Sequence, residues 1–377
     1  MSRSEKVCLG SPLVSVVMSV FNGERFLAEA VESILDQSFR DFEFIVIDDG
    51  STDGSARILE GYARRDPRVQ VCQQDNQGLV CSLNRGCGLA RGKYIARMDA
   101  DDISVRDRLL WQVDFMEQHP GVAVVGGAIE RINSSGDGLE IKRYATGDDE
   151  IKTALARNRS ELPHPAVLIR REIFCSVGGY RTAFVDAEDY DLWLRMAECS
   201  QLSNLSRVVL KYRVHCAQIT RTRLRQQALS VLAANAIASC KRNGGSGSPT
   251  WVGGVTPSTL AGLGIPEATQ QSAIAAAHLF WVKCLSRWGQ ESDALSLMAE
   301  VSRTCQSECI DRWVIADTRL AMARIYWKRK RFLRSLLAAS HAVITRPVML
   351  GRPLKPLLRP VRKALAMLNR PVSASAN

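Results

Sequence analysis

The sequence lacks any hydrophobic run long enough to predict a membrane-spanning segment, and its first ten residues lack the apolar core of a signal peptide. Of its two long uncharged stretches, 243–266 is interrupted by glycine and proline, and 268–282 is too short and too polar to cross a bilayer. Hydrophobic residues make up 46% of the 377 residues and charged residues 24%, which excludes disordered, fibrous and polytopic membrane proteins. We therefore expect a soluble globular protein of about two domains.

The chain also lacks the cysteine patterns of a disulfide framework or a zinc site. Its eleven cysteines are an odd number at irregular spacing, with no Cys-x-x-Cys. Cys305 and Cys309 lie four residues apart, but no pair of histidines or cysteines nearby would complete a metal site. We expect reduced thiols, packed as small apolar groups, in a cytoplasmic protein.

Acidic residues are missing from the last part of the chain. The formal net charge is +11, yet no Asp or Glu follows Asp317, whereas fourteen Lys and Arg lie between Arg319 and Arg370. The rest of the chain is therefore slightly acidic, and the basic character belongs to the tail.

Short β-rich runs alternate with amphipathic helical windows over the first 127 residues. Strands are expected at 14–20, 42–47, 68–72, 93–98 and 122–127, and helices at 25–35, 53–63, 79–90 and 105–118. Such alternation predicts an α/β fold with a mostly parallel sheet and helices on both faces. Ligands of these folds bind at the carboxyl ends of strands, so the residues there become candidates for function.

Shorter elements and then helices are expected in the rest of the chain. A strand is predicted at 166–170, and helices at 189–199, 267–288, 291–308 and 312–339. The polar stretch 243–249 predicts a linker. We divide the chain into an N-terminal extension (1–10), a sheet-containing domain (11–217), a helical region (218–317) with a Gly/Ser/Pro linker at 243–266, and a basic tail with helix and proline (318–377).

Three carboxylates in four residues, Asp99-Ala100-Asp101-Asp102, directly follow the expected strand at 93–98. Such crowding costs stability unless a cation or solvent compensates the repulsion. Mg²⁺ and Mn²⁺ prefer oxygen ligands, and they bind through one or two carboxylates plus the phosphates of a substrate. The alternative is a solvated acidic turn that caps the next helix. The position at the ligand edge of the sheet favours a metal site.

A second acidic strand end, Asp48-Asp49-Gly50-Ser51-Thr52-Asp53, follows the expected strand at 42–47. Gly50 permits a tight turn. The Asp49 carboxylate is able to accept a hydrogen bond from the imide N–H of a uracil-like base. Helix capping by Ser51 or Asp53 is the structural alternative, and we expect it in addition.

A third acidic cluster, Glu188-Asp189-Tyr190-Asp191, opens the helix expected near 189–199. One hypothesis is that these acids only complement the helix N-terminus. The other is that Asp189, which follows the glycine pair Gly178-Gly179, supplies a general base, a role that needs a carboxylate or imidazole within reach of the substrate proton. The pattern alone favours neither.

Taken in order, these motifs closely resemble family 2 glycosyltransferases of the GT-A fold. The resemblance rests on segments 14–22 (VSVVMSVFN), 48–53, 99–102 and 188–193, whose order and spacing match across roughly residues 13 to 214. It implies a Rossmann-like nucleotide-diphospho-sugar transferase fold. It also implies an inverting enzyme of bacterial type that moves a sugar from a nucleotide-sugar donor, a UDP-sugar, to an acceptor hydroxyl with Mg²⁺ or Mn²⁺.

The resemblance implies donor-side roles for individual residues. Ser19 and Phe21 are expected to line the base, with Phe21 in place of the commoner Tyr, which keeps a stacking face and loses a hydroxyl. Asp49 is expected to contact the uracil ring. Asp99 is expected to face the ribose and sugar of the donor, and Asp101 to bind the metal that bridges the diphosphate.

On the acceptor side the resemblance implies Asp189 as the catalytic base, with Glu188 beside it and Trp193 packing the helix. A single displacement with inversion needs no covalent nucleophile, and the sequence has neither a Gly-x-Ser-x-Gly motif nor a Gly-x-x-x-x-Gly-Lys phosphate loop. Segments 164–171 and 212–215 resemble acceptor-side pieces of these enzymes. There His164 and His215 are interpreted first as structural hydrogen-bonding residues, with contact to donor phosphate or acceptor as the alternative.

Two other functions stay open at this point. A sugar-phosphate nucleotidylyltransferase would share the layered sheet and the acidic residues, but Phe21-Asn22-Gly23-Glu24-Arg25 is a poor version of its glycine-rich loop. A non-catalytic nucleotide-sugar binding protein would not need both Asp101 and Asp189. The favoured interpretation is a hexosyltransferase of cell-surface polysaccharide or glycolipid biosynthesis.

The basic tail suggests a partner. Lys328-Arg329-Lys330-Arg331 precede three leucines, and basic–proline pairs follow from Arg346-Pro347 to Arg359-Pro360. Anionic lipid attracts such segments by about 1 kcal/mol per basic residue. One hypothesis is peripheral attachment to the inner face of a bacterial membrane, where glycan or lipid-linked acceptors are presented. A solvated tail is the alternative, and nucleic acid is not expected because no recognised motif for it is present.

Overall fold

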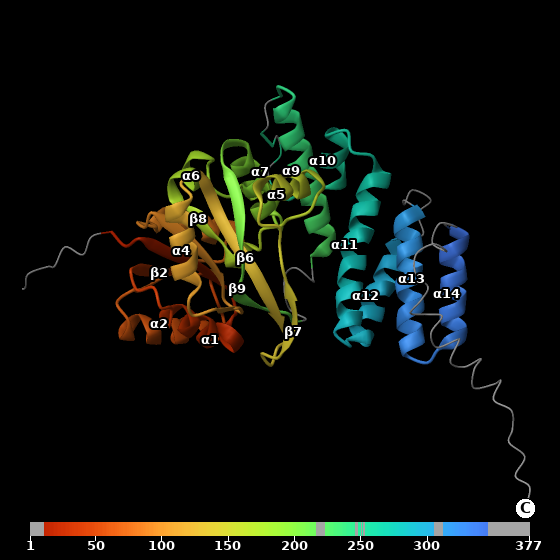
Figure 1. Cartoon of the computed structure of the whole chain (residues 1–377), viewed down its shortest axis with the longest axis horizontal. Helices are drawn as coiled ribbons and strands as arrows, with labels where there is room; N and C mark the ends of the chain where they lie inside the picture. The colour runs from red at the N-terminus through yellow and green to blue at the C-terminus, as the bar shows by residue number, and fades with distance from the viewer. Residues whose placement is uncertain are drawn as a thin grey trace, which may run out of the picture. The chain divides into compact units, whose positions relative to one another are not determined.

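The computed structural model describes residues 11–215, 223–245, 248–249, 251, 253–304 and 312–345. The chain forms two compact units, Met1–Leu263 and Gly264–Asn377, each treated by itself below (Figure 1). The four-part division expected from the sequence stays a prediction. Among the described helices, none is long and apolar enough to cross a membrane.

Four parallel strands form one half of the sheet of the first unit, in the order β3-β2-β1-β4. They are β1 (Val14–Val20), β2 (Phe42–Asp48), β3 (Val69–Gln73) and β4 (Tyr94–Asp99). The helices α1 (Glu24–Leu35), α2 (Ser55–Arg65) and α3 (Leu79–Leu89) connect them in turn. Strands of a parallel sheet are buried on both faces, so near-continuous apolar runs such as VSVVMSV identify them. These predicted elements are confirmed to within two residues.

The other half of the sheet is mixed. Strand β8 (Leu168–Arg170) lies antiparallel between β4 and β6 (Val122–Ile132), β6 runs parallel to β9 (Gln201–Arg213), and β5 (Ile103–Ser104) is antiparallel to β9. Strand β7 (Gly138–Lys142) pairs with the end of β6. The α/β fold expected from the sequence is confirmed, with the parallel order confined to β3-β2-β1-β4 and the β6–β9 pair.

Strand β6 continues five residues beyond the predicted end at position 127. A Cβ atom added to Gly126 would collide with the Asn204 side chain, and one on Gly127 would lie 2.7 Å from Val209. The glycines therefore do not end the strand. They let β9 approach β6 closely, which is a recognised use of glycine inside a strand.

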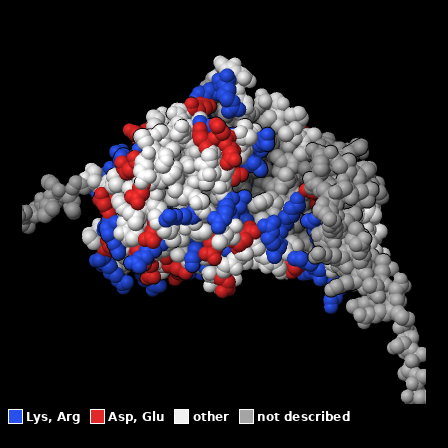
Figure 2. Space-filling view, viewed as in Figure 1, with Lys and Arg blue, Asp and Glu red and all other residues white. Residues whose placement is uncertain are grey.

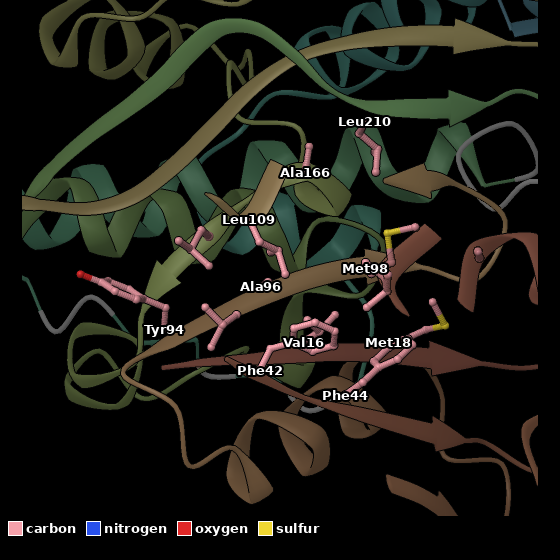
Figure 3. Close-up of a cluster of buried hydrophobic side chains, with 14 of the residues drawn as sticks. Val16, Met18, Phe42, Phe44, Tyr94, Ala96, Met98, Leu109, Ala166 and Leu210 are labelled. Carbon is pink, nitrogen blue, oxygen red and sulfur yellow. The ribbon is translucent and has the colours of Figure 1, made fainter. Parts of the chain in front are cut away.

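The main core lies on one face of the sheet. Alternate residues of β1, β2 and β4 point into it, among them Val16, Phe44 and Met98, as the period of two in a strand requires (Figure 3). Helices α1 and α4 (Arg108–Gln118) cover this face, whereas α3 covers the opposite one. Helix α4 begins three residues later than predicted because β5 pairs with β9 just before it.

The remaining α-helices of the first unit lie between β7 and β9 in the chain or follow β9. They are α5 (Asp148–Ala156), α6 (Arg171–Ser176), α7 (Glu188–Cys199), α9 (Leu224–Arg242) and α10 (Pro257–Gly262). On the face seen in Figure 2, acidic and basic side chains are interspersed over the coloured part of the molecule.

The second unit consists of helices among its described residues. They are α11 (Glu267–Arg287), α12 (Glu291–Thr304), α13 (Arg312–Lys328) and α14 (Phe332–Thr345). Val282 and Leu285 of α11, Met298 of α12 and Ile325 of α13 share one apolar core. For the helix predicted at 291–308, the predicted end at position 308 lies outside the described residues.

The single helix predicted at 312–339 is wrong, because α13 ends within the basic run and α14 begins after it. Lys330 adopts a φ of +58°, the left-handed conformation that ends helices. Its N–H donates to the Trp327 carbonyl at 2.9 Å, and that of Arg331 donates to the Tyr326 carbonyl at 2.8 Å. This is the hydrogen-bond pattern of a Schellman motif, and four adjacent like charges make a continuous helix less favourable there.

Candidate functional site

Two acidic strand ends meet at one edge of the sheet. Asp99, the last residue of β4, is paired in register with Ser19 of β1, and Val20 of β1 is paired with Asp48 of β2. Because β1 lies between β2 and β4, the carboxyl ends of all three strands are neighbours. The structure thus brings the predicted residues Ser19, Asp49 and Asp99 to the same edge.

Asp99, Asp101 and Asp102 form a tight acidic cluster. One carboxylate oxygen from each lies within 4.8 Å of those of the other two. Burial raises the pKa of Asp99, and repulsion from Asp101 adds to the rise. Burial also raises the pKa of Asp102 well above its usual value, with further repulsion from the other two acids. The cluster therefore favours a bound proton or cation.

Asp102 is fixed from the far end of the domain. Its Oδ1 accepts a hydrogen bond of 2.8 Å from the Arg213 backbone N–H. Its Oδ2 is buried and has no hydrogen-bond partner among the described residues. The Arg213 guanidinium donates to the Asp101 backbone carbonyl at 2.8 Å, so Arg213 of β9 binds two neighbouring residues of the acidic turn. A buried carboxylate oxygen without a partner is costly unless a cation or proton neutralises it.

Asp101 lies beside His215, which follows β9. The Nε2 atom of His215 is 2.9 Å from Asp101 Oδ2, and its ring lies 5.3 Å from that of Phe26. The sequence analysis interpreted His215 first as a structural hydrogen-bonding residue but did not connect it with Asp101. Only the pairing of β5 with β9 places it next to the aspartate.

Arg97 links the acidic cluster to the other half of the site. Its side chain is 4% exposed and pairs with Asp99. Burial disfavours the charged guanidinium, but Asp99, Tyr180 and Glu188 together outweigh this and hold the pKa of Arg97 above its usual value. The Arg97 charge in turn favours the ionised forms of Glu188 and Asp189 and so offsets part of the rise that burial causes in their pKa values. Sequence reasoning missed this residue, although a lone charge inside the strand YIARMD was a visible signal.

Glu188 and Asp189 are the first residues of α7. Burial raises the pKa of Glu188 to about 8, and repulsion from Asp189 contributes to the rise. Burial raises the pKa of Asp189 to about 6, although the Tyr190 backbone N–H donates to its Oδ1 at 2.7 Å. The two carboxylates are coupled, so near neutral pH the pair favours holding one proton and one negative charge between them.

His164 and Tyr180 pack beside Glu188. His164 Nε2 lies 2.8 Å from Tyr180 Oη, and His164 Nδ1 lies 3.9 Å from Glu188 Oε1. Burial holds the pKa of His164 well below its usual value, so the imidazole is neutral. The buried Trp193 ring contacts His164 edge-on at 6.1 Å. This agrees with the structural interpretation of His164.

The residues predicted to contact the nucleotide base of the donor differ in exposure and in how many hydrogen bonds they already make. Phe21 is 53% exposed, so its ring is available for stacking. Asp49 is buried, and its carboxylate accepts from the N–H groups of Gln77 and Gly78 and from Gln74 Nε2. A carboxylate offers about four acceptor positions, so one remains for a ligand. The predicted cap by Ser51 or Asp53 is wrong, because α2 begins at Ser55 after Gly54 and has no side-chain cap; Asp53 Oδ1 accepts from the Ser55 N–H at 3.0 Å just ahead of the helix.

Asn84 of α3 joins the two halves of the site. Its Nδ2 donates to the Tyr180 carbonyl at 2.8 Å, and its Oδ1 accepts from the Tyr180 N–H at 3.0 Å. The loop that precedes α7 is thereby tied to the parallel half of the sheet.

Comparison with known sequences gives one family. The model of glycosyl transferase family 2 matches residues 15–178, which include Asp49 and the acidic cluster and end before Glu188. EpsE of Bacillus subtilis is 37% identical over 191 residues, which is 50% of this chain and 67% of EpsE. The O-antigen biosynthesis glycosyltransferase WbnJ of Escherichia coli is 32% identical over 207 residues, covering 54% of this chain and 80% of WbnJ.

Comparison with solved structures bears on the fold. TarS 1-349 of S. aureus in complex with UDP-GlcNAc matches with a TM-score of 0.50 and 16% sequence identity, covering 87% of this chain and 90% of that chain. The shared architecture is the GT-A fold expected from the sequence.

Proposed function

Because the chain belongs to glycosyltransferase family 2, we propose that this glycosyltransferase moves a hexose from a UDP-sugar to an acceptor hydroxyl with inversion of configuration. The observation that carries the proposal is the placement of the acidic cluster and the Glu188–Asp189 pair on either side of Arg97. One group of acids suits a diphosphate-bound cation, and the other suits a proton acceptor. Membership of this family argues against a sugar-phosphate nucleotidylyltransferase. Because the relatives are named glycosyltransferases, it also argues against a non-catalytic nucleotide-sugar binding protein.

The acidic cluster fits a divalent cation, either Mg²⁺ or Mn²⁺. Its oxygens are close together, one of them is buried without a partner, and burial raises the pKa of two of its three acids. We assign Asp101 as the metal ligand, with the His215 imidazole beside it and Asp99 facing the donor sugar. When bound, a divalent ion would offset the charge of the leaving diphosphate.

Asp189 is the proposed catalytic base. With a pKa of about 6 it is ionised at neutral pH and still basic enough to take a proton from an acceptor hydroxyl. Glu188, with a pKa of about 8, stays protonated under the same conditions and leaves the negative charge on Asp189. Since the acceptor oxygen attacks the sugar directly, one displacement inverts the anomeric centre.

The donor base is proposed to lie between Phe21 and Asp49. The exposed Phe21 ring offers a stacking face, and the free acceptor position of Asp49 would bind the uracil N–H. Ser19 lines the same edge beside Asp99. All three lie at strand ends of the sheet-containing domain, residues 11–217, which we propose as the catalytic domain.

Replacing Asp189 by Asn tests the base. Transfer should fall by about 10³-fold, within the range that general bases contribute, while donor binding stays within about twofold. UDP release measures transfer, and a thermal-shift screen of UDP-glucose, UDP-galactose, UDP-GlcNAc and GDP-mannose with and without Mn²⁺ selects the donor. Asp191→Asn is unsuitable as a control because Asp191 pairs with Arg181 and Arg195, so the exposed Asp114→Asn serves instead. Full transfer by the Asp189 variant would refute the assignment.

The acceptor is proposed to be a glycan or a lipid-linked glycan of the cell surface. WbnJ, a relative by sequence, is named for O-antigen biosynthesis, and this supports a role in surface polysaccharide or glycolipid synthesis. Acceptors of that kind are presented at the cytoplasmic face of the membrane, so we propose a cytoplasmic enzyme that attaches there peripherally.

Helix α14 supplies an observation that favours this attachment. Leu333, Leu336 and Leu337, spaced as one helix face, are 73%, 58% and 54% exposed. Exposed basic residues flank them, including Arg329, Arg331 and Arg334. Leucines beside cations suit the interface of an anionic bilayer, whereas a nucleic acid backbone would leave the leucines in water.

Vesicle sedimentation tests the attachment. The triple variant Leu333→Ser, Leu336→Ser and Leu337→Ser should lose at least about tenfold in affinity for vesicles of phosphatidylcholine and phosphatidylglycerol, because apolar burial and charge act together. Ile141→Ser, a substitution at another exposed apolar residue, should bind like the parent. Binding that survives the triple variant, or that is equal on pure phosphatidylcholine, would reject α14 as the lipid contact.

A further inference from the structure

The loop that leads into the base carboxylates, residues 183–187, adopts a conformation that needs support. Asp186 has a φ of +66°, in the left-handed region that residues other than glycine rarely occupy. Such a conformation persists only where surrounding contacts hold it. Asp189 comes three residues later, so the path of this loop decides where its carboxylate lies.

Helix α9 holds this loop on the side before the carboxylates. The buried Ser230 hydroxyl donates to the Val185 carbonyl at 2.8 Å, and Arg223, just ahead of α9, lies 3.4 Å from the Asp186 carboxylate. The indole N–H of Trp251 donates to the Ala183 carbonyl at 3.2 Å. Three contacts therefore come from residues that follow the sheet in the chain.

The same helix holds α7 on the side after the carboxylates. Asn235 Nδ2 lies 2.9 Å from Tyr190 Oη and 3.0 Å from the Leu155 carbonyl, and the Tyr190 hydroxyl also donates to that carbonyl. Tyr190 is the residue next to Asp189 and donates its backbone N–H to the Asp189 carboxylate. Tyr190 thus links α9, through its side chain, to the Asp189 carboxylate, through its backbone N–H.

We propose that Ser230 and Asn235 are positioning residues, which fix the Glu188–Asp189 pair from both sides; the inference rests on the proposed role of Asp189. Both residues lie beyond the stretch matched by the family model and beyond the sheet. The part of the chain after the sheet thereby contributes to the reaction, although none of its side chains need touch the substrate.

Two measurements on Ser230→Ala and Asn235→Ala test the proposal. Amide hydrogen exchange of the peptide covering 183–190 should become at least about tenfold faster. In the variants the loop opens without having to break the hydrogen bonds of Ser230 or Asn235. UDP release from the UDP-sugar chosen by the thermal-shift screen should fall about ten- to hundredfold, while the affinity for that donor stays within about twofold.

Lys241→Gln is the matched control. Lys241 Nζ binds Glu198 at 2.6 Å, so this variant breaks a contact between the same two helices away from the carboxylates. It should leave both the exchange of 183–190 and UDP release at the parent's values. Equal losses in Lys241→Gln would mean that α9 only stabilises the fold, and the proposal would be wrong.

The outcomes also separate this proposal from the one on which it rests. If Asp189→Asn keeps its rate, both fail. If Asp189→Asn loses activity while Ser230→Ala and Asn235→Ala exchange and turn over like the parent, the positioning role alone fails. Should Ser230→Ala not fold, the half-buried Asn235 decides the question, since its loss leaves Ser230 in place.

Discussion

The donor half and the base half of the site are held in different ways. Asp99 ends β4 and Asp49 follows β2, with β1 between the two strands, so the register of β1, β2 and β4 places both residues. Glu188 and Asp189 start a helix after a loop, and side chains from α3 and α9 place that loop. One half depends on backbone pairing, and the other depends on a few side-chain hydrogen bonds.

The difference bears on how each half responds to substitution. Backbone pairing within a buried sheet is shared over many residues, so single side chains of the donor half act mainly through their own chemistry. In the base half, we expect a substitution at some distance from the substrate to move the carboxylates. Substitutions in the two halves should therefore separate into effects on donor binding and effects on rate.

The largest effect that would sharpen this contrast is expected from Asp101→Asn. Loss of a metal-binding carboxylate should weaken donor binding in Mn²⁺ by at least about 10²-fold, the upper end of the effect of losing an outer-shell partner. Isothermal titration with the donor chosen by the thermal-shift screen measures it. Asp114→Asn, an exposed residue of α4 with the same change of charge, is the control. Unchanged affinity would break the donor-half assignment.

A smaller effect is expected from Asn84→Ala, which cuts the link between the halves. The Tyr180 N–H and carbonyl would each lose a partner, at a cost of about 1–3 kcal/mol in the free energy of unfolding. Urea unfolding measures the cost, and UDP release should fall more than donor affinity. Arg85→Gln, the next residue of α3, bonds toward Gln73 and Gln74 instead and should leave the rate unchanged.

The smallest effect is expected from Glu188→Gln. The pKa of Glu188 is about 8, so at pH 7 the residue is already neutral and glutamine imitates it. UDP release at pH 7 should stay within about threefold of the parent. Asp189 is active when ionised, so the rate should rise with pH through about 6 in both proteins. A loss as large as that of Asp189→Asn would mean that the reaction uses a charge on Glu188.

The donor half could be predicted from the sequence because its signals are local. Apolar runs bounded by turn residues located β1, β2 and β4, and in a parallel sheet their carboxyl ends must lie together. That arrangement places Asp49, Asp99 and Asp101 at one edge, whereas their individual roles were implied by the resemblance to family 2 glycosyltransferases. The acidic start of α7 was visible as well, but its two interpretations could not be separated by pattern.

What the sequence could not reveal depends on partners far along the chain. Arg97 matters because α7 packs near it, His215 because β9 pairs with β5, and Ser230 because α9 lies against the loop at 183–187. The end of β6 was predicted five residues too early for the same reason, since its pairing with β9 extends the strand. No local pattern encodes such pairings.

Arg213 connects the acidic turn with residues near both ends of the domain. Besides Asp102 and Asp101 it binds Glu29 of α1, a residue 184 positions earlier, and its guanidinium lies 4.5 Å from the Phe26 ring centre. A ribosome that has made β1 to β4 has therefore produced most of the donor-binding residues without the strand that secures them. During synthesis, the nucleotide-sugar site should form only after β9 has left the ribosome and paired with the sheet. We therefore expect the ability to bind the donor to appear late in folding.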